Sequence, residues 1–181
     1  MNIASRYHCS GLSLINLLMT LSILSILLGL GIPSLSHLLE SNKKRLVISE
    51  LMLMLNLARD SAVGFSKSVV ICPTNDSQQC QKDWNAPLMV FVDFNENHIF
   101  DGSDRLLQIF RPCKENQSLD IRMSGPRYYL SYDALGTTGN QNGRIYFCNK
   151  SAKEPNDRVQ IIFYRTGRAR IPAMKEYKPG C

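Results

Sequence analysis

The residues best suited to binding chemistry are basic and gather at the C-terminal end of the chain. Of its 181 residues, 21 are Lys or Arg and 15 are Asp or Glu, which gives a net charge of +6. Residues 140–181 hold nine of the basic residues and three of the acidic ones, so the rest of the chain carries no net charge. Here Gly167 precedes Arg168 and Arg170, whose spacing puts both guanidinium groups on one face of an extended segment. Guanidinium groups bind phosphate oxygens in bidentate fashion. This end therefore predicts a polyanionic partner, and the plainer alternative is a solvated strand and tail.

Patterns for catalysis and metal binding are missing from the sequence. His8, His37 and His98 form no H-E-x-x-H motif, and no two cysteines are spaced as C-x-x-C. No G-x-S-x-G motif and no phosphate-binding G-K-[ST] motif occurs either. The sequence therefore predicts a protein that is not an enzyme and that holds neither a cofactor nor a metal.

One segment, residues 93–104, has the oxygen-rich composition of a calcium-binding loop. Asp or Asn side chains stand at its first, third, fifth, ninth and twelfth positions. However, His98 occupies the sixth position, where the sharp turn favours glycine, and Asp104 replaces the longer Glu at the twelfth. Asn and Asp also favour hairpin turns, because their side chains bond their own backbone. We therefore favour a structural turn over a calcium site.

A long apolar stretch lies near the N-terminus of the chain. No charged residue occurs at 12–39, and a helix of this length, rising ~1.5 Å per residue, exceeds the ~30 Å hydrocarbon core of a bilayer. A buried core helix is one alternative, but such a helix is rarely apolar on every face over this length. A cleavable secretory signal is the other, and its apolar run would be shorter. We predict a membrane-spanning helix.

Residues 40–66 continue with helical spacing, with apolar positions on one face and charged residues on the other. Beyond residue 66 the pattern changes to short strand-like runs separated by turn-rich stretches. The predicted strands are residues 68–72, 88–94, 105–110, 120–123, 128–132, 144–148 and 158–165. One helix followed by seven strands predicts an α+β fold, in which the amphipathic half of the helix packs on an antiparallel β-sheet.

A short polar leader ending in glycine precedes the apolar run. From Gly11 the chain reads Gly-Leu-Ser-Leu-Ile-Asn-Leu-Leu, which resembles the class III signal of type IV prepilins. The resemblance implies a leader peptide at 1–11, cleavage between Gly11 and Leu12 by prepilin peptidase, and N-methylation of Leu12. Asn16 replaces the Glu of most pilins and favours a scarce or specialised subunit. Pro33 stands where many pilins carry a proline, which is expected to bend or locally melt the helix.

Motifs in the body of the chain narrow the family. They are Val70-Ile71-Cys72-Pro73, Trp84, Val90-Phe91-Val92-Asp93, Asp104-Arg105-Leu106-Leu107, Phe147-Cys148 and Gly167-Arg168-Ala169-Arg170. Their order resembles that of the FimT/GspH class of minor pilins and pseudopilins. The resemblance implies a type IV pilin-like fold with a transmembrane half-helix at 12–39, an amphipathic half-helix at 40–66 and a β-rich periplasmic or extracellular domain at 67–181. It further implies a single-pass inner-membrane protein, and its partners would be that membrane, prepilin peptidase and other type IV pilins.

The same resemblance implies two functions. Gly167, Arg168 and Arg170 match the Gly-Arg-x-Arg motif by which FimT-type pilins bind DNA, which implies sequence-independent binding of double-stranded DNA during DNA uptake in natural transformation. Arg165, Lys175 and Lys178 are expected to extend this site. The GspH side of the class implies instead a structural or priming minor pilin, or a type II secretion pseudopilin, that does not bind DNA. The concentration of charge at one end favours DNA binding.

Five of the six cysteines follow the implied leader, and a periplasmic domain can form disulfides. Cys72 with Cys80 would close a short loop between neighbouring elements. Cys148 with Cys181 would tie the C-terminal tail to a strand. Cys113 is then left over, either as a buried thiol or as a residue that displaces one of these pairings.

Overall fold

The computed structural model describes residues 13–76, 79–113, 117–126, 128–149, 159–178 and 180, with only the backbone at 30–41, 44, 149 and 174. The chain divides into two compact units, Met1–Lys43 and Lys44–Cys181. One helix, α1 (Leu14–Phe65), contributes to both units. Its end is one residue short of the predicted end at 66.

In the first unit, α1 presents large apolar side chains outward. Leu14 is 76% exposed and Ile15 60% exposed. The hydroxyls of Thr20 and Ser22 donate 2.8 Å hydrogen bonds to carbonyls three and four residues earlier in the helix, which satisfies these polar groups locally. The helical backbone continues through Pro33, so the helix is not melted there. Among residues with described side chains, no helix is long and apolar enough to cross a membrane. Residues 12 and 30–39 of the predicted span lie outside that set, so the span stays a prediction.

Within its described residues, the second unit contains two antiparallel sheets of four strands each. The first has the order β3-β2-β1-β5 and the second the order β4-β6-β7-β8. The strands of the first sheet are β1 (Ser68–Pro73), β2 (Leu88–Asp93), β3 (Arg105–Phe110) and β5 (Leu130–Tyr132). Those of the second are β4 (Gln117–Met123), β6 (Gly143–Asn149), β7 (Val159–Phe163) and β8 (Ala169–Arg170).

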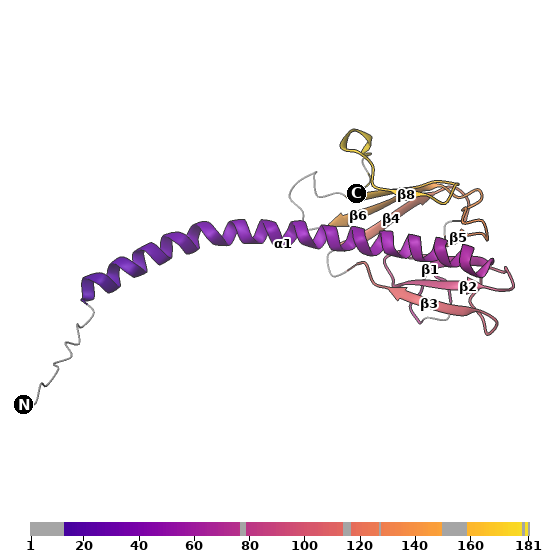
Figure 1. The fold of residues 1–181 in the computed structure, drawn as a ribbon, viewed down its shortest axis with the longest axis horizontal. Coiled ribbons are helices and arrows are strands. Elements are labelled where there is room, and N and C mark those ends of the chain that lie inside the picture. Colours follow the sequence, from indigo (N-terminus) through magenta and orange to yellow (C-terminus); the bar gives the residue numbers. More distant parts are fainter. Residues whose placement is uncertain are drawn as a thin grey trace, which may run out of the picture. The chain divides into compact units, whose positions relative to one another are not determined.

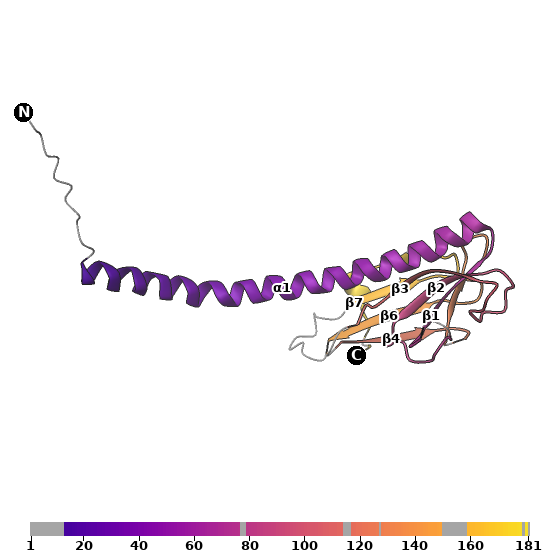
Figure 2. The same ribbon diagram turned by 90° about the horizontal axis from the view of Figure 1, so that it is seen from below.

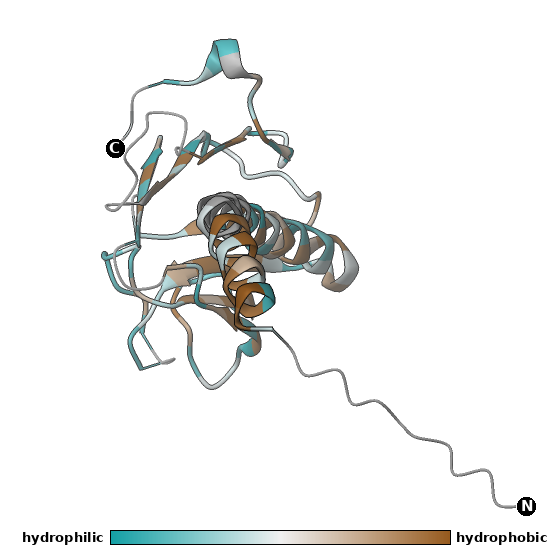
Figure 3. Cartoon of the chain, turned by 90° about the vertical axis from the view of Figure 1, so that its left-hand side faces the viewer, coloured by the Kyte–Doolittle hydropathy of each residue, from teal (hydrophilic) through white to brown (hydrophobic). Residues whose placement is uncertain are grey.

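The C-terminal half of α1 joins the two sheets. Figure 1 shows β1, β2 and β3 on one side of this half-helix and β4, β6 and β8 on the other, and Figure 2 shows that both sheets lie beneath it. Buried apolar residues recur on α1 at helical spacing, with Leu51, Met54, Leu55, Ala58 and Ala62 each at most 1% exposed. They form one core cluster with residues of both sheets. In Figure 3, where the backbone is coloured by hydropathy, hydrophobic segments occur on both the helix and the strands.

The helix ends in a hydrogen-bonded cap that sets the start of β1. Ser66 has a φ of 52°, and its N–H donates to Val63 O while the Lys67 N–H donates to Ala62 O, both at 3.2 Å. These two bonds form a Schellman motif, with serine at the left-handed position that glycine usually fills. The chain then reverses into β1, which pairs with β2 and β5.

The predicted α+β, pilin-like class is confirmed, but the sheet arrangement differs in two ways. The strands belong to two sheets rather than one, and an eighth strand, β8, follows the predicted set. Two residues are too few to show a strand period, so β8 has no signal in the sequence.

Candidate nucleic-acid interface

The segment between β7 and β8, residues 164–168, forms a tight turn that we name the basic turn. The Gly167 N–H donates a 2.8 Å hydrogen bond to Tyr164 O, and the Tyr164 N–H donates one of 3.0 Å to Arg168 O. Gly167 has a φ of 76°, a conformation that glycine adopts without steric penalty. A short turn closed by a left-handed residue is a common hairpin connection, so the local sequence accounts for the reversal.

The basic turn is fixed against the loop that follows β5. The Thr138 N–H donates to Arg165 O at 3.0 Å, and the Thr138 hydroxyl donates to Tyr164 O at 3.1 Å. Arg59 of α1 donates from Nε to Gly136 O at 3.0 Å. A Cβ atom at Gly167 would lie 1.8 Å from the same Gly136 oxygen. Gly167 is therefore required for packing against this loop, and because it is buried it offers no open backbone to a polyanion.

Arg165 and Arg168 extend from the basic turn into solvent. Both side chains are exposed, and within the described residues neither has a hydrogen bond or an ion pair. Two unpaired guanidinium groups on a fixed turn are available to a phosphate group without first breaking an internal contact. These are the predicted binding residues whose geometry suits that role directly.

Arg170, by contrast, is already engaged. Its Nη1 and Nη2 donate to the two carboxylate oxygens of Glu176 at 2.7 and 3.1 Å, and its Nε donates to the Tyr164 hydroxyl at 3.0 Å. Glu176 also accepts the Ala173 N–H at 2.9 Å. The hydrogen bonds from Arg170 and from the Ala173 backbone lower the pKa of Glu176 to about 2, and those to Glu176 and Tyr164 raise the pKa of Arg170. The sequence carried no signal for this pair, because residues six apart meet only where the chain folds back.

The described part of the C-terminal tail, residues 171–178 and 180, crosses the second sheet. It contains a short 3₁₀ helix, η2 (Met174–Glu176). The side-chain oxygen of buried Gln160 accepts the Lys178 N–H at 3.3 Å, and its amide nitrogen donates to Lys178 O. Arg122 Nη2 donates to Gly180 O at 2.8 Å. The side chains of Lys175 and Lys178 are exposed on this anchored tail.

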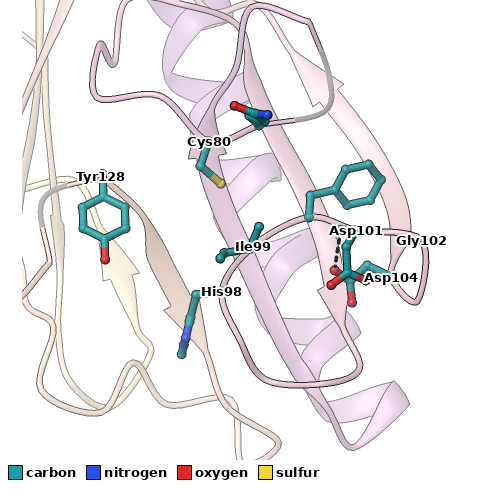
Figure 4. Close-up of a pocket in the computed structure, with 9 residues that line it drawn as sticks. Cys80, His98, Ile99, Asp101, Gly102, Asp104 and Tyr128 are labelled. Atoms are coloured by element: carbon teal, nitrogen blue, oxygen red, sulfur yellow. Dashed lines mark hydrogen bonds between the residues drawn. The ribbon is translucent and has the colours of Figure 1, made fainter.

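The oxygen-rich segment at 93–104 is an internally hydrogen-bonded turn. Asp93 accepts the N–H groups of Asn97 and His98 at 3.2 and 2.8 Å, and Asp104 accepts those of Phe94 and Asp101 at 3.0 Å. Asp101 accepts hydrogen bonds from Ser103, Asn95 and Asn97, which lower its pKa. Figure 4 shows Asp101 and Asp104 close together in an open hollow that His98 and Tyr128 also line. These carboxylates have the partners that a structural turn provides, and no group of three metal-ligating side chains gathers within the described residues.

A disulfide joins Cys72 to Cys80, with an S–S distance of 2.03 Å and a Cα–Cα distance of 5.4 Å. Cys113 is a half-buried free thiol, and burial together with nearby Asp83 and Glu50 raises its pKa to about 11. Cys148 is disulfide-bonded. Its predicted partner, Cys181, lies outside the described residues, so that pairing stays a prediction.

The predicted cleavage site, Gly11 and Leu12, also lies outside the described residues.

Residues 47–167 match a protein family described as type II transport protein GspH. Two crystal forms of the type IV minor pilin FimU of Pseudomonas aeruginosa are similar in structure, with TM-scores of 0.55 and 0.52 and sequence identities of 18% and 17%. The matches cover 76% and 73% of this chain and 93% and 94% of FimU. The minor pseudopilin EpsH of the Vibrio cholerae type 2 secretion system has a TM-score of 0.47 at 16% identity, over 71% of this chain and 97% of EpsH. No curated protein matches the sequence. The similarity to FimU shows a shared fold, a helix packed on antiparallel sheets.

Proposed function

This chain belongs to the GspH family of type II transport proteins, and on that premise we propose that it binds double-stranded DNA through its C-terminal basic residues. As a family member it is a minor pilin or pseudopilin of a type IV pilus or a type II secretion system. It is a structural subunit rather than an enzyme, and its partners are other pilins. The proposed addition is capture of DNA for uptake in natural transformation, by a subunit anchored in the inner membrane with its C-terminal unit in the periplasm or in an extracellular pilus.

The observation that carries this proposal is the pair of exposed arginines on the basic turn. The side chains of Arg165 and Arg168 have no hydrogen-bond or ion-pair partner among the described residues, although the turn that bears them is fixed by Thr138 and by packing against Gly136. A filament subunit that only packs against its neighbours gains little from two unpaired cations on a rigid turn. A phosphate backbone would satisfy both of them.

The exposed Lys175 and Lys178 extend the basic surface along the tail. Contacts from Lys and Arg to phosphate oxygens carry no sequence information, so binding should be independent of DNA sequence. Four such contacts predict an affinity in the non-specific range, with a dissociation constant of ~10⁻⁴–10⁻⁶ M at physiological salt. They also predict that log affinity falls with log salt at a slope of about −3.6 for duplex DNA.

The test is a fluorescence anisotropy titration of labelled duplexes of two unrelated sequences, each measured at several salt concentrations. The unit from Lys44 to Cys181 suits this experiment because it contains the buried core. Replacing Arg165 and Arg168 together by Gln should weaken binding to both duplexes and flatten the salt slope by about 2 units. Circular dichroism should show an unchanged fold.

The matched control removes two exposed arginines at the two ends of β3, Arg105 and Arg111, also by substitution with Gln. This variant has the same net charge as the basic-turn variant, so a loss specific to Arg165 and Arg168 assigns the site. Equal binding by the basic-turn variant and the parent protein contradicts the assignment. If the parent protein shows no binding at low salt, the alternative function is a structural or priming subunit without DNA binding.

A further inference from the structure

Three arginines stand in register across the second sheet. Arg122 of β4 pairs with Arg144 of β6, Arg144 pairs with Ile162 of β7, and Ile162 pairs with Arg170 of β8. Residues paired directly across neighbouring strands project on the same face of a sheet. The sheet therefore carries a row of guanidinium groups, here named the arginine row (Arg122, Arg144 and Arg170).

Each member of the arginine row holds the tail. Arg170 binds both carboxylate oxygens of Glu176, Arg144 donates from Nη1 to the backbone oxygen of Glu176 at 3.1 Å, and Arg122 donates to Gly180 O at 2.8 Å. Two of these three arginines contact a single tail residue, Glu176. The tail thus follows the row across the strands, and Glu176 is its main point of attachment.

The lysines proposed to bind DNA lie on this same tail. Lys175 precedes Glu176 directly, and Lys178 follows it by two residues. Gln160, which binds the backbone of Lys178, also accepts a hydrogen bond from Arg144 at 3.1 Å. The positions of both lysines therefore depend on contacts that the arginine row makes.

We infer that Arg170 is a positioning residue rather than a phosphate ligand: through Glu176 it fixes η2 and thereby keeps Lys175 and Lys178 in place on the basic surface. This inference rests on the proposed DNA binding. It divides the Gly-Arg-x-Arg segment by role, with Arg168 contacting phosphate and Arg170 holding the tail. It also makes Glu176, an acidic residue, a requirement for binding a polyanion.

The decisive variant is Glu176→Gln, because the two possible roles of Arg170 predict opposite results. If Arg170 positions the tail, Glu176→Gln releases η2 and weakens duplex binding about tenfold, because two lysine contacts are lost. The salt slope then flattens by about 2 units even though the net charge has increased by one. If Arg170 is a latent phosphate ligand, the same variant frees it, so that binding tightens and the slope steepens. Asp60→Asn is the control, since it makes the same charge change at an exposed residue of α1.

The full-length protein in neutral detergent is titrated with duplex DNA, and amide hydrogen exchange is followed in residues 171–178. Arg170→Gln, Glu176→Gln and the double variant should show equal losses of affinity and equally faster exchange, because they break one ion pair. Arg144→Gln should resemble them. Tighter binding by Glu176→Gln than by Asp60→Asn overturns the inference, as does a double variant that loses as much as both single variants combined.

The exchange measurement separates failure of this inference from failure of the proposed function. If the parent protein binds no DNA but Glu176→Gln and Arg170→Gln accelerate exchange in the tail, the proposed function fails and the attachment of the tail stands. If exchange in the tail is the same in the parent protein and in both variants, Arg170 does not position the tail. The inference is then overturned whatever the affinity.

Discussion

The carbonyl oxygen of Gly136 occupies the place that a side chain on Gly167 would take. A Cβ atom at Gly167 would lie 1.8 Å from that oxygen, and the backbone there already has a φ of 76°. Since Gly136 lies in the loop after β5 and Gly167 between β7 and β8, this contact joins the two sheets. Arg59 of α1 donates its hydrogen bond to the same oxygen, so helix, loop and basic turn meet at one point.

Gly167→Ala is therefore expected to destabilise the second unit. The left-handed conformation alone costs a non-glycine residue about 1–3 kcal/mol, and the contact with Gly136 adds to that cost. Urea unfolding of the Lys44–Cys181 unit measures the change. Gly102→Ala is the control, because nothing lies within 4 Å of its added Cβ, and its unfolding midpoint should stay close to that of the parent protein. Equal unfolding midpoints for the two variants would show that the contact between Gly167 and Gly136 does not contribute to stability.

The disulfide between Cys72 and Cys80 should stabilise the unit by lowering the conformational entropy of the unfolded chain. The two residues are eight apart, and a loop of this length predicts about 2–3 kcal/mol in the chain-entropy treatment. The double variant Cys72→Ala with Cys80→Ala should lose that amount in urea unfolding. The single variant Cys113→Ala, which alters a half-buried free thiol, should lose less. If Cys113→Ala lowers the free energy of unfolding by more than the double variant does, side-chain packing contributes more to stability than the cross-link.

The Glu176 carboxylate should remain ionised far into the acid range. Its pKa is lowered to about 2 by hydrogen bonds from Arg170 and the Ala173 backbone. A carboxyl group whose pKa is lower in the folded state stabilises the fold above its unfolded pKa of about 4.5, and this contribution is lost as the pH falls toward 2. Carbon-detected NMR titration of the carboxyl group measures the pKa directly. In Arg170→Gln it should rise toward the ordinary value, and an unchanged pKa would contradict the pairing.

Processing at the N-terminus is a prediction from the sequence alone. The Gly11–Leu12 order predicts cleavage between these residues and a methylated Leu12 at the start of the mature chain. Mass spectrometry of protein extracted from membranes tests both points. A mature chain that begins near Ser34 or later would indicate an ordinary secretory signal instead.

The predicted Cys148–Cys181 disulfide would add a covalent tie to a tail that Arg122, Gln160 and Arg170 already hold. Non-reducing peptide mapping should recover these two cysteines in one cross-linked peptide pair. Because the hydrogen bonds are independent of oxidation, we expect reduction to leave Lys175 and Lys178 largely in place. Recovery of Cys181 linked to Cys113 would contradict the pairing.

Local sequence patterns were sufficient to identify the helix and most of the strands. Helical spacing of apolar residues identified the core face of α1, and β3 has the bounds that its pattern predicted, residues 105–110. The end of the helix and most other strands fall within a few residues of their predicted positions, because periodicity and turn residues act over short distances. The resemblance to the FimT/GspH class likewise rested on short motifs that occur in the same order along the chain. The match of residues 47–167 to the GspH family supports the GspH part of that resemblance.

The way in which those elements combine depends on contacts between segments that are distant in the sequence. The division into two sheets depends on which strands pair, and strand pairing is a contact between distant segments that no local pattern encodes. The same holds at the basic end, where the sequence presented Arg168 and Arg170 as equivalent. The chain folds back after β8 and brings Glu176 to Arg170 but not to Arg168, so one arginine is paired and the other remains exposed. The spacing of Arg168 and Arg170 predicted that their guanidinium groups share one face. Which of the two can bind a phosphate depends on Glu176, which the fold places beside Arg170.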